Sequence, residues 1–395
     1  MKVLMINHFP ISGSGSGTYT RNIAVHLIKK GHELSIAMPE NTRKFSNVPG
    51  VRMYPVFFSY EEAIANALPF NFPCFTTHPR STMTFFDLSE SQLEAYLSAF
   101  EKAIGKAIDE CKPDVIHGQH IWLLSWVAGR TQIPYVVTAH GTDLMGYQRS
   151  ARFRRYADEA AAGAKRIITI SNDNDELVRE LFPGCTDKTV FMRNGYDPER
   201  FYPEPTTREE IAESFGINLA ERLVLFVGKL AHFKGVDVLI DAARFYEGER
   251  PGKITTIITG DGELSQQLKK QAADLNVRGV HFLGHLEISQ LRKLYSIADA
   301  CIVPSRREPF GLVAVEALAC GSPVIATNQG GLPDIINDEV GALVDVDDSY
   351  GLSTAILHEL YRPDRQERKK NAAKYAYEKY AQDFLMDTLI DIYNS

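Results

Sequence analysis

Residues 303–334 read VPSRREPFGLVAVEALACGSPVIATNQGGLPD, and the alternation within this stretch decides the fold. The apolar residues that lead into it predict a buried strand, and a polar loop then leads into a helix predicted over 310–319. Gly321 and Pro323 end that helix, because glycine and proline are common stop signals, and the apolar run 324–326 predicts the next strand. Strand, helix and strand in this order predict a parallel sheet.

The same alternation continues along the chain in both directions. Several of its apolar runs are apolar from end to end, as strands buried on both faces of a sheet require. Helical patterns, such as that over 17–30, lie between many of them. The predicted strands are 3–7, 34–37, 51–54, 115–117, 135–138, 166–170, 189–192, 223–227, 253–259, 280–282, 300–303, 324–326 and 342–344. The chain is therefore predicted to be an α/β protein.

The alternation weakens over residues 194–208 (NGYDPERFYPEPTTR), where prolines and polar residues predict a linker. We therefore predict two Rossmann-like, doubly wound domains, residues 1–196 and 197–375, that face an interdomain cleft. Ligands of such sheets bind at the carboxyl ends of the strands.

The C-terminus has an apolar stripe at helical spacing that includes Tyr377 and Phe384. The stripe either packs on the second domain or crosses back to the first. We assign the predicted helix 376–395 to the first domain, which it would complete.

The composition excludes several classes of protein. The chain has 395 residues, enough for two or three domains, and 44% of them are hydrophobic. With 43 Lys and Arg against 50 Asp and Glu, the net charge of −7 argues against a general nucleic-acid binder. Five cysteines without a CxxC pair indicate a reducing compartment, and no run of about 18 apolar residues predicts a membrane span. The apolar run at the N-terminus is too short for a signal peptide. We expect a cytoplasmic protein, with peripheral contact to the inner face of the membrane left open.

Glu308 and Glu316 are eight residues apart, roughly 12 Å if all eight residues were helical. Carboxylate pairs of glycosidases are about 5 to 9.5 Å apart, so this pair is poorly spaced to act as acid and nucleophile. It is well spaced to bracket a diphosphate that carries a sugar at each end, or it is two solvated glutamates at a helix end. The predicted helix start at Phe310, Gly311 and Leu312 offers free N–H groups to a phosphate, and Gly311 permits close approach.

This stretch resembles the Glu-x7-Glu signature of family-4 retaining glycosyltransferases, which have the GT-B fold of two Rossmann-like domains. The resemblance rests on EPFG at 308–311, Glu316, the run ALACGSPVIA at 317–326 and the glycine pair at 330–331. It implies that Glu308 contacts the transferred sugar and that Glu316 holds the ribose of the nucleotide.

A second match is FVGKL at 226–230 followed by HFKG at 232–235. In the family, two cations after this strand hold the diphosphate of the donor, which implies that role for Lys229 and Lys234 beside Gly228. Lys229 stands where the family has arginine, and a lysine is a point charge rather than a bidentate fork. Two solvated lysines are the alternative.

The first domain contributes a glycine-rich loop, SGSGSG at 12–17, and a histidine, His140, at the end of a predicted strand. The loop spacing is not that of a dinucleotide site, so a flexible turn is the alternative. The resemblance implies that Gly15 and Gly17 approach the donor phosphates and that His140 approaches the transferred sugar. His117 and His120 could line the acceptor side. They could also bind a metal, but the sequence pattern contains no third ligand for one.

Four further features have structural or functional interpretations. Asp173-Asn174-Asp175 is interpreted as the start of a helix capped by Ser171, and the acidic run 345–348 as a turn, so neither is predicted to bind a metal. The arginines between residues 149 and 155 form either a solvated helix face or a contact for an anionic acceptor or membrane. The apolar loop 69–75 is an acceptor wall or a membrane foot.

The sequence therefore predicts a retaining glycosyltransferase. It would move a hexosyl group from a nucleotide sugar, expected to be UDP-linked, to a hydroxyl of a glycan, glycolipid or small molecule. The resemblance implies front-face attack by the acceptor, no metal and no cofactor. The alternatives are another GT-B activity, such as a nucleotide-sugar epimerase or a phosphorylase, and a two-domain sugar-binding protein without catalytic activity. The sequence leaves the base, the sugar and the acceptor open.

Overall fold

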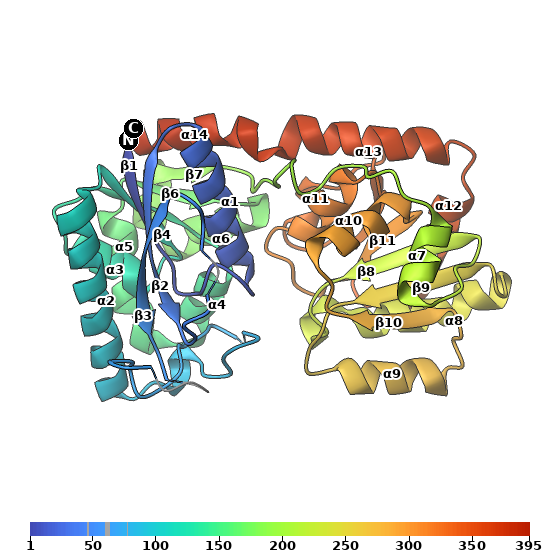
Figure 1. The fold of residues 1–395 in the computed structure, drawn as a ribbon, viewed down its shortest axis with the longest axis horizontal. Coiled ribbons are helices and arrows are strands. Elements are labelled where there is room, and N and C mark those ends of the chain that lie inside the picture. Colours follow the sequence, from blue (N-terminus) through green and yellow to red (C-terminus); the bar gives the residue numbers. More distant parts are fainter. Residues whose placement is uncertain (46, 60–63, 77) are drawn as a thin grey trace. The chain divides into compact units, whose positions relative to one another are not determined.

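The computed structural model describes residues 1–45, 47–59, 64–76 and 78–395, and Figure 1 shows its course. The chain divides into two compact units: unit 1 contains Met1–Asn194 and Gln382–Ser395, and unit 2 contains Gly195–Ala381. In the part of the chain that is described, no helix combines the length and hydropathy that crossing a membrane requires.

Unit 1 contains a seven-stranded parallel sheet in the order β3-β2-β1-β4-β5-β6-β7. The order reverses direction between β1 and β4, which makes the carboxyl ends of these two strands the expected place for a ligand. The strands are β1 Lys2–Ile6, β2 Glu33–Glu40, β3 Val51–Phe57, β4 Val115–Gln119, β5 Tyr135–Thr138, β6 Arg166–Thr169 and β7 Thr189–Phe191.

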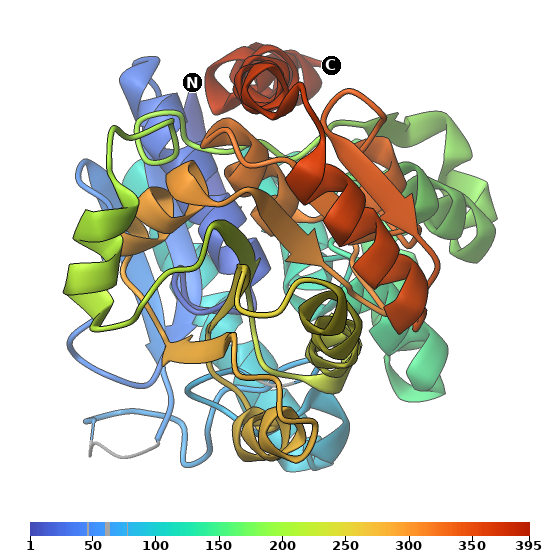
Figure 2. The same cartoon turned by 90° about the vertical axis from the view of Figure 1, so that its right-hand side faces the viewer.

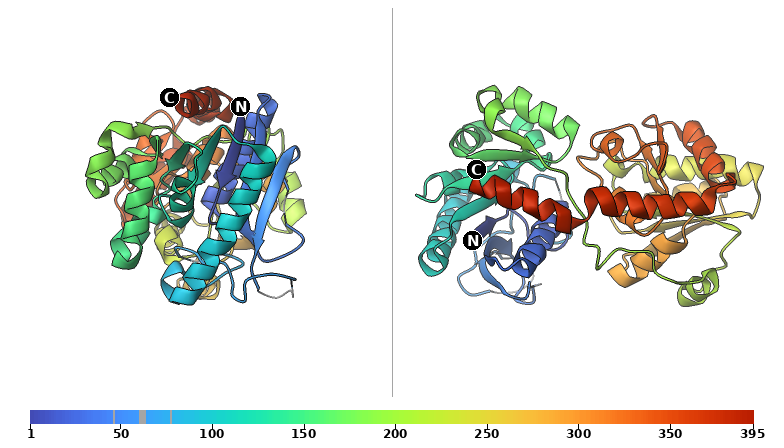
Figure 3. Two further views of the ribbon diagram at one scale, coloured as in Figure 1. Left: turned by 90° about the vertical axis from the view of Figure 1, so that its left-hand side faces the viewer. Right: turned by 90° about the horizontal axis from the view of Figure 1, so that it is seen from above.

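Helices cover both faces of this sheet. One core lies under α2, α3 and α5, and a second core lies under α1 and α14 (Figure 3). The helices of unit 1 are α1 Gly15–Lys29, α2 Glu90–Cys111, α3 Leu123–Gly129, α4 Thr142–Arg149, α5 Arg154–Gly163, α6 Asn172–Leu181 and α14 Gln382–Asn394, with 3₁₀ turns at Phe85–Asp87, Ala151–Phe153 and Pro183–Lys188.

Unit 2 contains a six-stranded parallel sheet in the order β10-β9-β8-β11-β12-β13, seen in front in Figure 2. Helices α8, α9 and α12 enclose the core on one face, while α10 and α11 contact strands β8, β11 and β12. The strands are β8 Arg222–Val227, β9 Ile254–Thr259, β10 Val280–Gly284, β11 Ala300–Val303, β12 Val324–Thr327 and β13 Gly341–Val344. The helices are α7 Arg208–Phe215, α8 Val236–Glu249, α9 Ser265–Asp274, α10 Ile288–Ile297, α11 Leu312–Ala319, α12 Ser349–Tyr361 and α13 Arg365–Tyr380, with 3₁₀ turns at His232–Lys234 and Leu332–Asp334.

Every strand predicted from the sequence is present, and the α/β class with two Rossmann-like sheets is confirmed. Two predicted helix starts were wrong by two residues. Helix α1 begins at Gly15, because the Ser14 hydroxyl caps it by accepting the N–H of Gly17. Helix α11 begins at Leu312 rather than Phe310, because Gly311 before it has a φ of 110°.

The predicted C-terminal helix is two helices, α13 and α14, separated by the extended residue Ala381. Helix α13 belongs to unit 2 and α14 to unit 1. The predicted stripe was wrong in part, because Tyr377 is 51% exposed and Phe384 is 54% exposed. The buried face of α14 includes Met386 and Tyr393.

The apolar loop 69–75 is part of the core of unit 1. Phe70, Phe72, Cys74 and Phe75 are all buried there, and Phe75 packs edge-on against Trp122. Its aromatic side chains are therefore not an exposed membrane foot.

Candidate active site

The loops that follow β8, β11 and β12 meet at the carboxyl edge of the sheet of unit 2. The N–H of Gly331 donates to the carbonyl of Glu308 at 2.9 Å. Gly235 approaches the loop after β11 so closely that a Cβ atom there would lie 1.9 Å from the carbonyl oxygen of Pro304. These contacts place the residues predicted for the donor site of this unit on neighbouring loops.

Lys234 and Glu308 form an ion pair at the centre of this edge. The Nζ of Lys234 lies 2.5 Å from Oε2 of Glu308, and the Ser305 hydroxyl donates to the same oxygen at 3.3 Å. The side chains are only 20% and 11% exposed, so the pair is largely shielded from water. The pair presents a cation and a carboxylate side by side, which suits a ligand with a phosphate next to sugar hydroxyls.

Lys229 lies on the same loop as Lys234, directly after Gly228. Its Nζ lies 3.5 Å from Oε2 of Glu263, which follows β9. The N–H of Gly228 donates to the carbonyl of Thr259 at 3.0 Å, so the loops after β8 and β9 are held together. The sequence analysis missed the β9 loop, although a Gly-x-Gly at 260–262 after a predicted strand was the available signal.

The start of α11 lies between the two glutamates. Phe310 is buried and packs edge-on against Tyr380, so its side chain is a core residue. Gly311 carries no side chain that could cap the helix, and the N–H groups of Leu312 and Val313 precede the first hydrogen bond of the helix, which Ala314 donates to Gly311. An uncapped helix start of this kind suits an anion.

Glu316 lies on α11 itself. Because only Leu312–Glu316 of the interval from Glu308 is helical, the helical spacing assumed for the two glutamates was wrong. Burial raises the pKa of the Glu316 carboxyl to about 7, while Arg200 and Tyr295 beside it act in the opposite direction. The group can therefore change its ionisation near neutral pH.

In unit 1, Gly15 and Gly17 both lie in the first turn of α1. The N–H of Gly17 is already donated to the cap at Ser14, and a Cβ on Gly17 would lie 2.2 Å from the carbonyl oxygen of Pro10. Apart from its own helix backbone and chain neighbours, Gly15 has no atom of the described residues within 4 Å of the position that a Cβ would take. Only Gly15 thus leaves room for a ligand beside it.

His140 follows β5 and is buried. Its Nε2 lies 2.8 Å from Oε1 of Gln119, and its N–H donates to Oδ1 of Asp143 at 3.1 Å. Burial lowers the pKa of His140 to about 3 and raises that of Asp143 to about 6, although the backbone N–H groups of Ile121 and His140 lower the latter. His140 is therefore neutral at physiological pH, and the contact of its Nε2 with Gln119 holds its ring.

His117 and His120 lie three residues apart and have different surroundings. Both ring nitrogens of His117 have partners, Tyr393 Oη and Thr138 Oγ1, each at 2.8 Å. Among the residues that the structure describes, neither ring nitrogen of His120 has a hydrogen-bond partner. Its φ is 85°, and its ring lies 4.8 Å from that of His140. His117 is thus a structural residue that anchors α14.

The two acidic motifs have structural partners, as predicted. Ser171 caps α6 by accepting the N–H of Asn174, and Asp175 binds Arg179 at 2.5 Å. In the second motif Asp348 caps α12 and Asp347 binds Arg306 at 2.6 Å.

The arginines between residues 149 and 155 also have partners within unit 1. Arg152 pairs with Glu90 at 2.9 Å, Arg155 lies 4.0 Å from Glu159, and Arg149 stacks over Phe86. Two of these guanidinium groups thus face a carboxylate of the same unit, which favours the solvated-face interpretation.

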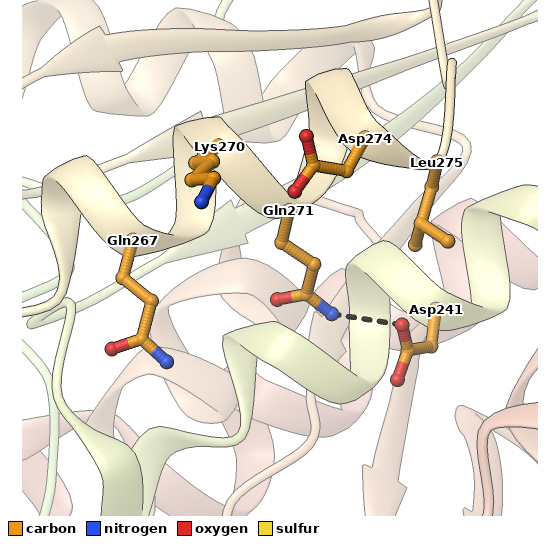
Figure 4. Close-up of a pocket in the computed structure, with 6 residues that line it drawn as sticks. All are labelled: Asp241, Gln267, Lys270, Gln271, Asp274 and Leu275. Carbon is orange, nitrogen blue, oxygen red and sulfur yellow. Dashed lines mark hydrogen bonds between the residues drawn. The ribbon is translucent and has the colours of Figure 1, made fainter.

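A separate depression of about 270 Å³ lies between α8 and α9 (Figure 4). Gln271 reaches across it and donates to Asp241 at 2.8 Å. It shares no residue with the predicted site.

Comparison with known proteins identifies the family. The model of "Glycosyltransferase Family 4" matches residues 13–200, and that of "Glycosyl transferases group 1" matches residues 207–379. An uncharacterised glycosyltransferase of Methanocaldococcus jannaschii is 29% identical over 418 residues, which cover 100% of this chain and 98% of the relative. A D-inositol 3-phosphate glycosyltransferase of Saccharomonospora viridis is 30% identical over 335 residues, covering 78% of this chain and 77% of the relative.

Solved structures agree on the fold. Sucrose-phosphate synthase from Thermosynechococcus elongatus superposes with a TM-score of 0.78 at 21% identity, covering 100% of this chain and 98% of that one. Anabaena HepE, solved in complex with UDP and glucose, superposes with a TM-score of 0.76 at 19% identity and covers 100% of both chains. The two parallel sheets, the matched family models and these relatives together show that the chain belongs to the group 1 glycosyltransferases of family 4 and is a glycosyltransferase with the GT-B fold.

Proposed function

We propose that this glycosyltransferase is a retaining hexosyltransferase with a UDP-linked donor bound by unit 2. The observation that carries the proposal is the ion pair between Lys234 and Glu308 beside the uncapped start of α11. In this proposal the diphosphate binds Lys229, Lys234 and the N–H groups of Leu312 and Val313. Glu308 accepts hydroxyls of the sugar, and Glu316 accepts hydroxyls of the ribose.

The charges indicate how the site would lower the barrier. As the bond between the anomeric carbon and the diphosphate breaks, negative charge grows on the leaving phosphate, and fixed cations and helix N–H groups stabilise it. The new bond to the acceptor oxygen forms on the same face, and the acceptor proton passes to the leaving phosphate oxygen. Glu308 is paired with Lys234 and hydrogen-bonded by Ser305, which suits it to orient a sugar rather than to attack it.

This proposal requires no metal, because lysines and a helix start supply the positive charge. Gly15 and His140 of unit 1 keep the roles that the family resemblance implies, with His140 neutral, whereas the N–H of Gly17 is taken by the cap at Ser14. We expect EDTA to leave turnover unchanged, whereas a metal-dependent transferase would lose it.

The donor can be tested by thermal unfolding with UDP, GDP, ADP and TDP. A ligand at about 100 times its dissociation constant adds about 2.7 kcal/mol to the free energy of unfolding, so the correct nucleotide stands out. We expect UDP to raise the Tm of the wild type and not that of Glu316→Ala. The exposed Glu339→Gln serves as the control and keeps the full shift.

Transfer is tested separately. Glu308→Gln should keep the UDP shift and lower kcat by about 10²-fold or more, as loss of one electrostatic contact to a transition state does. Full turnover in both Glu308→Gln and Glu316→Ala would contradict the site. Isomerised sugar nucleotide formed without any acceptor would indicate an epimerase instead.

A further inference from the structure

Arg306 makes a set of contacts that the proposed reaction does not use. Its Nη1 and Nη2 donate to the two carboxylate oxygens of Asp237 at 2.9 and 2.6 Å, in a bidentate fork. Its Nε donates to Asp347 at 2.6 Å, and Nη1 also donates to the carbonyl of His232 at 2.7 Å. One guanidinium thus has four polar contacts on three partners, and its side chain is only 18% exposed.

These partners belong to different connections at the carboxyl edge of the sheet. Arg306 itself lies between β11 and α11, and Asp347 lies between β13 and α12. His232 is the first residue of the 3₁₀ turn that joins β8 to α8, and Asp237 lies in the first turn of α8. The backbone repeats the connection, since the N–H of Arg306 donates to the carbonyl of Phe233 at 2.9 Å. Arg306 therefore ties three loops together at one point.

The tied loops carry the central ion pair. Lys234 lies between His232 and Asp237 in the chain, and Glu308 lies two residues after Arg306. A lysine ammonium sits on a flexible stem, so its position depends on the backbone beneath it. Misplacing a catalytic group by about 1 Å can cost roughly 10²-fold in rate.

We propose that Arg306 is a positioning residue that holds the Lys234 loop against the Glu308 loop, so that the ammonium and the carboxylate face the donor at a fixed separation. The inference rests on the proposed function of these two residues. It also gives Asp347 of the acidic turn a role, as the second carboxylate that orients the guanidinium. Lysine cannot replace Arg306, because it lacks the planar fork that Asp237 and Asp347 bind from two sides.

The test compares kcat at saturating donor for Arg306→Ala and Arg306→Lys with the neighbouring, exposed Arg307→Ala as the matched control. We expect Arg306→Ala to lower kcat by about 10- to 100-fold and Arg306→Lys to recover only part of it. Arg307→Ala should keep the wild-type value. Asp347→Asn, which removes the negative charge from one of the four contacts, provides a milder variant should Arg306→Ala not fold.

A double-mutant cycle separates positioning from general stability. In the Lys234→Ala background no ammonium is left to place, so Arg306→Ala should lower kcat by less than about 3-fold. An equal loss in both backgrounds, or a wild-type kcat for Arg306→Ala, would overturn the inference. Wild-type transfer by Glu308→Gln and Lys234→Ala would instead overturn the proposed function itself.

Discussion

The carboxyl group of Glu316 has a pKa close to neutral pH, well above that of an ordinary glutamate. Its pKa rises from 4.5 to about 7 because the folded chain buries it. Between these two values the folded state binds more protons than the unfolded state. The contribution of Glu316 to the free energy of unfolding is therefore fully present below pH 4.5 and is lost as the pH rises through 7.

We predict that Glu316→Gln removes this pH dependence. The free energy of unfolding of the wild type, measured in urea, should fall between pH 5 and pH 8. We expect this fall to be about 1 to 3 kcal/mol larger than that of the variant. The affinity of the wild type for UDP should instead be higher at pH 8 than at pH 5, because only the ionised carboxylate accepts both ribose hydroxyls. If the free energy of unfolding depended on pH equally in Glu316→Gln and in the control Glu339→Gln, the pKa shift of Glu316 would be contradicted.

Whether the role of a single residue could be predicted from the sequence depended on how far along the chain its contacts lie. Glu308, Gly311 and Lys234 could be placed because motif spacing reflects loops at one sheet edge. His117 and His120 could not be separated, because their difference lies in partners remote in the chain: Tyr393 reaches His117 from α14. Arg306 lay inside the quoted motif, but its carboxylates come from two other loops.

At the scale of elements, the junction between β8 and α8 depends on Gly235. Its φ is 65°, and a Cβ there would lie 1.9 Å from the carbonyl oxygen of Pro304. Gly216, which ends α7, has nearly the same φ of 63°, but apart from its chain neighbours no atom of the described residues lies within 4 Å of its Cβ position. Both glycines adopt a left-handed backbone conformation, but only at Gly235 would a side chain also clash with a neighbouring loop.

We predict that Gly216→Ala costs about 1 kcal/mol, the strain of a left-handed residue with a side chain. Gly235→Ala should cost about 3 kcal/mol or more and should lower kcat as well, since the clash separates the Lys234 loop from the β11 loop. Urea unfolding and a transfer assay measure both effects. Equal costs for the two variants would mean that the close approach is relaxed at little expense.

Strands were easier to predict than helix ends. A strand buried on both faces, such as β11 Ala300–Val303, is apolar throughout and is bounded by Asp299 and Pro304, which a sequence shows directly. Helix α11 begins two residues late because Gly311 adopts a conformation that periodicity does not register. The break at Ala381 also escaped prediction. One extended residue ends the helix, but apolar residues continue in the sequence on both sides of it.

At the scale of the whole molecule, unit 1 differs from unit 2 in its buried histidines. Burial lowers the pKa of His8, His117 and His140 to about 3, and it lowers the pKa of His120 well below 6.5. The unfolded chain, in which these groups titrate near 6.5, therefore binds more protons as the pH falls. The stability that the neutral histidines contribute is present above pH 6.5 and is lost as the pH falls towards 3.

We predict that unit 1 unfolds first in acid. Both tryptophans, Trp122 and Trp126, lie in unit 1, so their fluorescence reports its unfolding specifically. The Tm followed by this signal should fall steadily below pH 6.5, and His120→Asn should reduce that slope whatever its effect on the Tm itself. The exposed His358→Asn of unit 2 should leave the slope unchanged, and a slope that His120→Asn does not alter would refute the assignment.

The division of the chain has a consequence for its synthesis. Unit 2 is one continuous segment, whereas unit 1 needs α14, which is translated after every residue of unit 2. Until α14 leaves the ribosome, the core under α1 lacks Met386, Leu389 and Tyr393. The half of the protein that is made first is therefore finished last, and a nascent chain exposes this apolar surface to chaperones while its second half is already folded.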